Sequence, residues 1–271
     1  MNIAFTTFAC PKWTLKQTVN FAASSGYQGV EFRTDAQHGH GIEAWISAKE
    51  RNIFRAQIER ADLKAACIAT SIQFTQDGVV EQAIERVKLA GEIGAEGARF
   101  FCGPLPEGAY RLEDVLPTVT RQLREVCEAA VLFNARVFLE THDTVATASE
   151  MMKVLKAVDH PSLSVCYNNL HPIRAGEPLE VTLNLLKGRI GFVHFHDGLK
   201  RTDQVVIRPM GRGEMPMEET FRGLIKIGYD GCLSGEWFYN QYGDVPKDAI
   251  ELYASEMRVL SERNGVVFRR S

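Results

Sequence analysis

The chain has 271 residues, a formal net charge of −3, and apolar and charged fractions of 45% and 24%. This length suits one α/β barrel, which needs roughly 250 residues and buries a large core without staples. The slightly negative charge excludes a general attraction to nucleic acid or to an anionic membrane, and no apolar stretch approaches the roughly 20 residues that span a bilayer. We therefore expect a small molecule as the partner.

Short apolar runs alternate with longer amphipathic segments along the chain. The runs predicted as strands are Ile3–Thr6, Gly29–Phe32, Ala65–Ala69, Gly97–Phe101, Arg136–Leu139, Leu163–Tyr167, Ile190–Phe195 and Cys232–Ser234. They are continuously apolar or small, which is typical of parallel strands buried on both faces. Between them apolar residues recur at helical spacing, and Gly26, Gly94 and Gly228 stand where a helix would end just before a strand.

Eight strand–helix units in this length predict an α/β fold, a single-domain (β/α)₈ TIM barrel over residues 1–271. A doubly wound open sheet is the main alternative. However, no G-x-G-x-x-G turn follows the first strand, and no G-x-x-x-x-G-K-[ST] loop occurs. No linker rich in proline, glycine or serine suggests a second domain.

The cysteines and the first residues bear on the compartment. Six cysteines are spread along the chain without a C-x-x-C pair, which favours reduced, mostly buried thiols. The start, MNIAFTTFAC, has no basic segment before its apolar run and is predicted to be a strand rather than a signal peptide. These features together predict a cytoplasmic protein.

Polar residues follow the last four predicted strands, at the end of a parallel barrel where function gathers. Glu140, Asn168, His196 and Glu236 are separated by about one strand–helix unit each. Oxygen and nitrogen donors on four neighbouring strands suit one divalent ion such as Mn²⁺, Mg²⁺, Co²⁺ or Zn²⁺. His194 shares a strand face with His196, so one is a candidate ligand and the other its neighbour in the barrel mouth.

Six segments resemble the sugar-phosphate isomerase/epimerase family of xylose-isomerase-like barrels. They are GYQGVEFR, FLETHD, VCYNNLHP, GFVHFHDG, GRGEMPMEETFRGLIKIGYDG and LSGEW. The resemblance covers the whole chain in strand order and is strongest from Phe138 to Trp237. The family includes ketose 3-epimerases, hydroxypyruvate isomerases and inosose dehydratases.

The resemblance implies one metal ion held after strands five to eight by Glu, Asp, His or Gln, and Glu. These positions fall on Glu140, Asn168, His196 and Glu236. Asn168 departs from the family's Asp, and an Asn ligates through its carbonyl oxygen without adding negative charge. We therefore expect a weakly bound metal, with a hydrogen-bonding spacer as the other interpretation of Asn168.

Substrate contacts are implied in the same way. The family's substrate-binding His falls on His171, and an Arg after strand seven falls near Arg201. His142 and His194 follow strands five and seven and are further candidates for substrate binding. Glu31 ends strand two, where it can reach the pocket or pair with a barrel arginine, Arg33 or Arg99.

Two loops carry further polar residues. Asp35, His38 and His40 follow strand two, either as an ordinary polar loop or as a substrate lid or second metal site. Basic residues between 200 and 212 form either a solvated loop or a site for a phosphate or carboxylate.

The leading functional hypothesis is a metal-dependent isomerase or epimerase of a ketose or related hydroxyketone. Glu140 and Glu236 would remove and return a proton beside the carbonyl through an enediolate. A dehydratase using the same enolate and a metal-free sugar-binding barrel are the alternatives. Apurinic endonucleases resemble the family, but the loops after strands three and four lack the additional His ligands they need. The oligomeric state, including a homo-oligomer, stays open.

Overall fold

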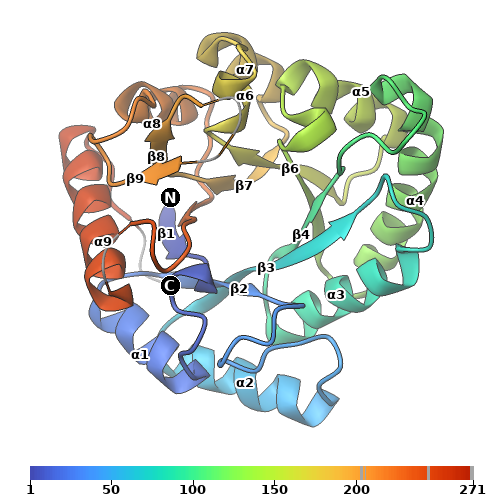
Figure 1. The fold of residues 1–271 in the computed structure, drawn as a ribbon. Coiled ribbons are helices and arrows are strands. Elements are labelled where there is room, and N and C mark those ends of the chain that lie inside the picture. The colour runs from blue at the N-terminus through green and yellow to red at the C-terminus, as the bar shows by residue number, and fades with distance from the viewer. Residues whose placement is uncertain (202–203, 205, 243–244, 269–271) are drawn as a thin grey trace.

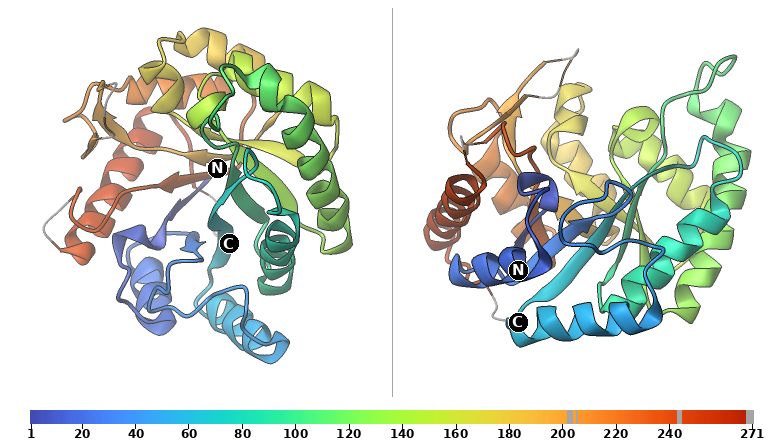
Figure 2. Two further views of the ribbon diagram at one scale, coloured as in Figure 1. Left: turned by 45° about the vertical axis from the view of Figure 1, so that its right-hand side comes forward. Right: turned by 60° about the horizontal axis from the view of Figure 1, so that its bottom comes forward.

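The parallel strands form a nearly closed barrel with the helices outside, as Figures 1 and 2 show for the computed structural model. The structure describes residues 1–201, 204, 206–242 and 245–268. The ring of parallel strands with helices outside confirms the predicted single-domain (β/α)₈ barrel and the α/β class. Within the described residues, no helix combines the length and the apolar character that a membrane crossing requires.

Each of the eight predicted runs forms a strand of the barrel. The strands are β1 (Asn2–Phe5), β2 (Gly29–Arg33), β3 (Lys64–Gln73), β4 (Gly97–Phe101), β5 (Arg136–Glu140), β6 (Leu163–Asn168), β7 (Ile190–His194) and β10 (Cys232–Gly235). Neighbouring strands pair in parallel in the order β1-β10-β7-β6-β5-β4-β3-β2. A bridge between Thr6 and Glu31 joins the first and last strands of this order. The carboxyl ends of the strands therefore meet at one mouth.

Helices follow the strands around the outside. They are α1 (Leu15–Ser24), α2 (Ala48–Arg60), α3 (Val80–Ile93), α4 (Leu112–Leu132), α5 (Ala148–Val158), α6 (His171–Arg174), α7 (Leu179–Leu186), α8 (Met217–Lys226) and α9 (Pro246–Arg263), with short 3₁₀ turns η1 (Thr7–Ala9) and η2 (Asp143–Val145). Gly94 ends α3 in the left-handed conformation, with φ of 79°, which only glycine adopts without strain. This confirms the predicted helix end.

The loop after β7 contains a small hairpin that the sequence pattern does not predict. Strands β8 (Asp197–Leu199) and β9 (Val206–Arg208) pair antiparallel. The Asp197 carboxylate accepts hydrogen bonds from the backbone N–H groups of Gly211, Gly213 and Met215, at 2.9, 2.9 and 3.1 Å. Asp197 therefore ties the return of this loop to the barrel.

An apolar layer closes the lower interior of the barrel, and we call it the floor. Its members are buried residues from six of the strands: Ala4, Ala66, Cys67, Phe138, Cys166, Phe192 and Cys232. The rings of Phe138 and Phe192 stack with centroids 5.7 Å apart. A Cβ at Gly191 would lie 2.6 Å from the Phe138 ring, so glycine is needed there for the stack to fit.

Candidate functional site

A polar layer lies directly above the floor. Glu140, Asn168, His194 and Ser234 each stand two residues beyond a floor residue of their own strand. Because alternate residues of a strand face the same side, these side chains also point into the barrel. All four are at most 1% exposed. The strand period thus places a buried polar cluster between the floor and the mouth.

His194 lies at the centre of three carboxylates. Its Nε2 lies 3.0 Å from Glu31 Oε1, and its Nδ1 lies 3.2 Å from both Glu140 Oε1 and Glu236 Oε2. The Ser234 hydroxyl also donates to Glu31, at 2.7 Å. Burial disfavours a charged imidazole, but the surrounding acidic groups raise the pKa of His194 well above its ordinary value. At neutral pH the ring is therefore a buried cation that holds the three carboxylates together.

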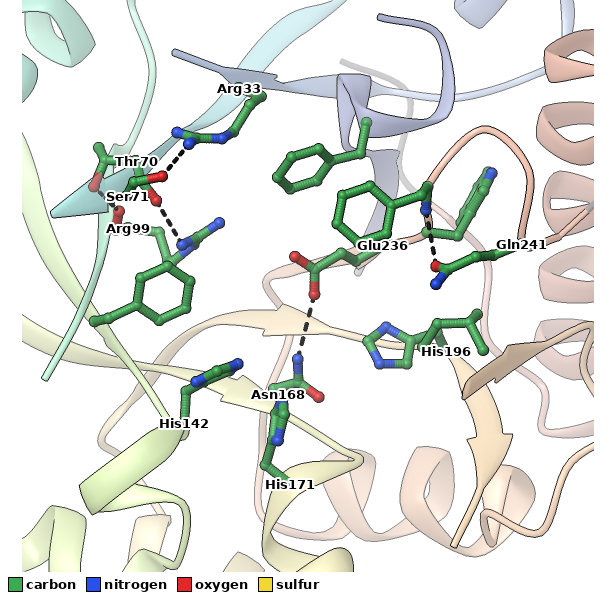
Figure 3. A pocket seen from close by; sticks show the side chains of 15 residues that line it. Arg33, Thr70, Ser71, Arg99, His142, Asn168, His171, His196, Glu236 and Gln241 are labelled. Atoms are coloured by element: carbon green, nitrogen blue, oxygen red, sulfur yellow. Dashed lines mark hydrogen bonds between the residues drawn. The ribbon is translucent and has the colours of Figure 1, made fainter. Parts of the chain in front are cut away.

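Asn168 links two of these carboxylates through its amide nitrogen. Its Nδ2 donates to Glu140 Oε1 at 2.9 Å and to Glu236 Oε2 at 3.3 Å, the second of which is drawn in Figure 3. Its Oδ1 accepts from the backbone N–H of Leu170 at 3.1 Å. Because a backbone N–H can only donate, this contact assigns the oxygen to the Leu170 side and the N–H₂ group to the carboxylates.

The two candidate acid–base groups sit in different surroundings. The pKa of Glu140 is well below its ordinary value, because the charges of His194 and Arg99 outweigh the effect of burial. The Arg99 Nε lies 3.2 Å from Glu140 Oε2. The pKa of Glu236 is raised instead, by burial and by the nearby charge of Glu140. Neighbouring carboxyls with opposite shifts are typical of acid–base sites.

A cavity of about 410 Å³ opens above this layer (Figure 3). Its lining residues are Phe8, Arg33, Thr70, Ser71, Arg99, Phe101, His142, Asn168, His171, His196, Ile207, Glu236, Trp237, Phe238 and Gln241. The rings of His142 and His171 lie 4.2 Å apart. The pKa of His171 is well below its ordinary value, because of burial and the nearby His142. The volume is in the range of small-molecule sites, roughly 300–1,000 Å³.

The structure brings most of the predicted site residues to this place. Asn168, His196, Glu236, His142 and His171 line the cavity. Glu140, Glu31 and His194 are buried one layer deeper. The substrate and catalytic roles assigned to all of them stay predictions.

Glu31 and Arg201 differ from what the sequence suggested for them. The Glu31 carboxylate contacts His194 and Ser234 rather than pairing with Arg33 or Arg99. Arg201 is exposed and is not among the described residues that line the cavity. Its backbone carbonyl accepts a hydrogen bond from Arg174 Nε. Substrate binding by Arg201 stays a prediction.

The sequence did not predict that Arg33 and Arg99 line the cavity. Arg33 and Arg99 both line it, from β2 and β4. Arg33 stands two residues beyond Glu31, so the alternation within β2 already put it on the inward face. The aromatic walls formed by Phe8 and Trp237 come from segments just after strands, where pattern gives no direction for a side chain.

The polar side chains of the loop after β2 have partners within the protein. Asp35 forms an ion pair with Arg86 at 2.6 Å, and the two histidines, His38 and His40, each lie within hydrogen-bonding distance of the Thr7 hydroxyl. The His40 Nδ1 also accepts from the backbone N–H of Ile42. These contacts favour the ordinary polar loop over a second metal site.

Three of the four predicted metal ligands, two at the cavity and one a layer deeper, have the chemistry of ligands for a divalent cation. Burial and the nearby His194 lower the pKa of His196 to about 3, so its imidazole is neutral, and its buried Nδ1 lacks a hydrogen bond. The buried Glu140 Oε2 also lacks a hydrogen-bond partner. Glu140, His196 and Glu236 stay the predicted ligands, whereas the amide of Asn168 presents its hydrogens to Glu140 and Glu236.

A second group of ligand atoms lies deeper. Atoms of Glu140, Cys166 and His194 lie within 4.8 Å of one another. However, burial raises the pKa of the Cys166 thiol to about 12, and both ring nitrogens of His194 face carboxylates. Because both ring nitrogens of His194 already face carboxylates, this group leaves a metal fewer free donor atoms than its three residues suggest.

Comparison with known proteins places the chain among related barrels. A 3-dehydroshikimate dehydratase of Bacillus anthracis is 24% identical over 264 residues, which cover 91% of each chain. A 3-keto-D-glucoside 4-epimerase from E. coli has a similar structure, with a TM-score of 0.77, 16% identity, and coverage of 97% of this chain and 99% of that one. The IOLI protein, solved with a zinc atom, has a TM-score of 0.82, 16% identity, and coverage of 97% and 99%.

A family model describes the same relationship from the sequence alone. The model of the xylose isomerase-like TIM barrel matches residues 19–263, which include strands β2 to β10 and all of the polar layer. The match agrees with the resemblance of the segments between residues 138 and 237 and with the barrel of the structure. The chain belongs to the xylose isomerase-like TIM barrel family.

Proposed function

We propose that this protein is an isomerase or epimerase of a small hydroxyketone. It removes a proton from the carbon beside the carbonyl and then returns a proton to the resulting intermediate. The observation that supports this most directly is the position of Glu236. Its carboxylate lines the cavity, while Asn168 and His194 hold it from below at 3.3 and 3.2 Å. A carboxylate held in this way is suited to be a general base.

In the proposed reaction, Glu236 accepts the proton of the C–H bond, and the electron pair of that bond forms the enediolate. Return of the proton to the neighbouring carbon, while the hydroxyl proton passes to the former carbonyl oxygen, gives the isomer. Delivery of a proton to the opposite face of the same carbon by a second acid gives the epimer. Glu140 is the predicted second acid–base group, but Arg99 and Asn168 engage its oxygens, so Glu236 is the residue that meets substrate. His142 and His171 would hold substrate oxygens on the facing wall.

A divalent metal held by Glu140, His196 and Glu236 would stabilise the negative charge that develops on the substrate oxygens. We expect Mn²⁺, Mg²⁺, Co²⁺ or Zn²⁺ in this role. Because Asn168 adds no charge to the donor set, the ion would be bound weakly.

A dehydratase is the second candidate, because the relative that matches over 91% of the chain carries that name. The same enediolate would expel a hydroxyl group from the next carbon, and an acid would give that hydroxyl a proton to release water. The first step is shared, so one assay addresses both reactions.

Exchange of substrate hydrogen with solvent tests this shared step. The protein is incubated in D₂O with each of the four metals and a panel of ketoses and hydroxyketones, and deuterium incorporation is followed by mass spectrometry. We expect exchange with at least one substrate and a loss of about 10²-fold or more in Glu236→Gln. The exposed Glu180→Gln is the matched control and should retain the full rate. Equal exchange in wild type and Glu236→Gln, or none on any substrate, would overturn the proposal.

A further inference from the structure

We propose that Arg33, Ser71 and Arg99 form a subsite for a carboxylate group, so that the substrate is an acidic hydroxyketone rather than a neutral sugar. We call these three residues the anion wall. The statement about the substrate rests on the proposed function, whereas binding of a carboxylate at the subsite can be measured without turnover. All three residues line the cavity, and Figure 3 shows them together on one side, with Glu236 across the cavity from them.

Arg33 is a buried cation whose own contacts are mostly to neutral groups. It is 6% exposed, and its guanidinium donates to the carbonyls of Thr34 and Ala69 and to the Ser71 hydroxyl. Its nearest carboxylate is Asp35, at 3.9 Å, and Asp35 already pairs with Arg86 at 2.6 Å. A buried charge of this kind is costly unless an opposite charge comes close.

Arg99 is held in place while one end of its guanidinium stays available. Its Nη1 donates to the Thr70 carbonyl at 2.8 Å, its Nε faces Glu140 at 3.2 Å, and the group lies 4.2 Å from the Phe101 ring centroid. Among the described residues, the hydrogen bond to the Thr70 carbonyl is the only one that its guanidinium makes. A rigid, partly unengaged guanidinium is the group that proteins use to recognise carboxylates.

The two arginines also act on each other. Burial and the nearby charge of Arg99 lower the pKa of Arg33 to about 10, even though carboxylates in the neighbourhood oppose this shift. Both guanidiniums are anchored on the backbone of β3, which lies between their strands, at the carbonyls of Ala69 and Thr70. The protein thus holds two like charges together, and a bound anion would relieve their repulsion.

A carboxylate suits this wall better than a phosphate. Glu140 faces Arg99 at 3.2 Å and Asp35 lies 3.9 Å from Arg33, so the excess positive charge at the anion wall is small and suits a monoanion better than a dianion. The donors that remain, on Arg99, Arg33 and Ser71, are few, whereas a phosphate dianion presents three strong acceptor oxygens. A substrate with its carboxylate here would extend into the cavity toward Glu236, which lies on the other side (Figure 3).

Binding of three probes on one carbon skeleton tests the subsite without turnover. The probes are D-fructose, D-fructuronate and D-fructose 6-phosphate, measured by calorimetry on the full chain with Mn²⁺ and again with chelator. We expect D-fructuronate to bind about tenfold or more tightly than D-fructose, and Arg33→Gln to bring this ratio close to one. Arg33→Lys keeps the charge and should retain part of the preference. The exposed Arg121→Gln changes net charge equally and should retain all of it.

Three results would overturn the subsite: equal affinities for the neutral and acidic probes, tighter binding of the phosphate than of the carboxylate, or no binding of any probe. Thermal melting of Arg33→Gln and Arg33→Lys shows whether each variant is folded. Solvent exchange with neutral ketoses alone would reject the anion wall and leave the proposed function intact. Preference for D-fructuronate without exchange on any substrate would support the anion wall and reject the proposed function.

Discussion

The floor and the polar layer of this barrel come from the same strands, two residues apart, yet they are built on opposite principles. In the floor, Phe138 and Phe192 stack in a tightly packed apolar interior. In the polar layer, Glu140 and His194 carry charges that are almost completely removed from water. Apolar burial is favourable by itself, whereas buried charges are tolerated only with matching partners. The comparison teaches that stability is concentrated in one layer and chemistry in the next.

The largest expected effect comes from breaking the floor. Phe138→Ala removes a buried ring from the stack and leaves a cavity, which should lower the free energy of unfolding by about 3–5 kcal/mol. Urea denaturation measures this difference, with the 59% exposed Val131→Ala as a control expected to change it by less than about 0.5 kcal/mol. A loss below about 1 kcal/mol for Phe138→Ala would mean that the floor is not tightly packed.

The corresponding change beside the polar layer is Arg99→Met, which keeps an unbranched side chain and removes its charge. Glu140 then loses one of its two cationic partners while it stays buried, so we expect a loss of about 3 kcal/mol in the free energy of unfolding. The exposed Arg121→Met is the matched control. A double-mutant cycle with Glu140→Gln isolates the pair, and a coupling near zero would contradict the ion pair.

Asn168→Asp tests the two hydrogen bonds by which the Asn168 amide bridges Glu140 and Glu236, and the effect of a negative charge at this position on metal binding. The variant replaces two hydrogen-bond donors by a third carboxylate, so the metal-free protein should lose about 1–3 kcal/mol of stability. The same carboxylate should tighten Mn²⁺ binding by about tenfold or more. Calorimetric titration and melting in chelator measure the two effects. Unchanged stability of the metal-free form would contradict the bridging amide.

The smallest expected effect distinguishes the two glutamates by pH. The lowered pKa of Glu140 stabilises the fold at pH values above the ordinary 4.5, and this contribution is lost as pH falls toward its pKa in the folded state. Glu140→Gln should therefore differ most from wild type at neutral pH, as the less stable protein, and the difference should shrink below pH 4.5.

Glu236 has the opposite sign. Its raised pKa means that ionisation costs the folded state stability as pH rises through 4.5 and beyond. The free energy of unfolding of Glu236→Gln should therefore rise relative to that of wild type between acidic and neutral pH. Denaturation at several pH values with chelator present measures both variants, and slopes of the same sign would contradict the different surroundings of the two carboxyls.

The strand runs and the polar residues that end them were readable from the sequence, because parallel strands buried on both faces leave short apolar runs. Because the carboxyl ends of barrel strands meet at one mouth, the sequence correctly grouped Asn168, His196 and Glu236, which all line the cavity. The hairpin β8–β9 was not predicted, because its three-residue strands are too short to show a period.

Only the tertiary structure decided how the polar residues are used. The sequence proposed Asn168 as an oxygen ligand, and the structure turns its nitrogen toward Glu140 and Glu236 because the Leu170 N–H occupies its oxygen. It also placed Arg33 and Arg99 on the cavity wall, although their strands look like ordinary apolar runs. Sequence period determines which face of a strand a side chain takes. The partner it meets there depends on strands distant in the chain, and only closure of the barrel brings those together.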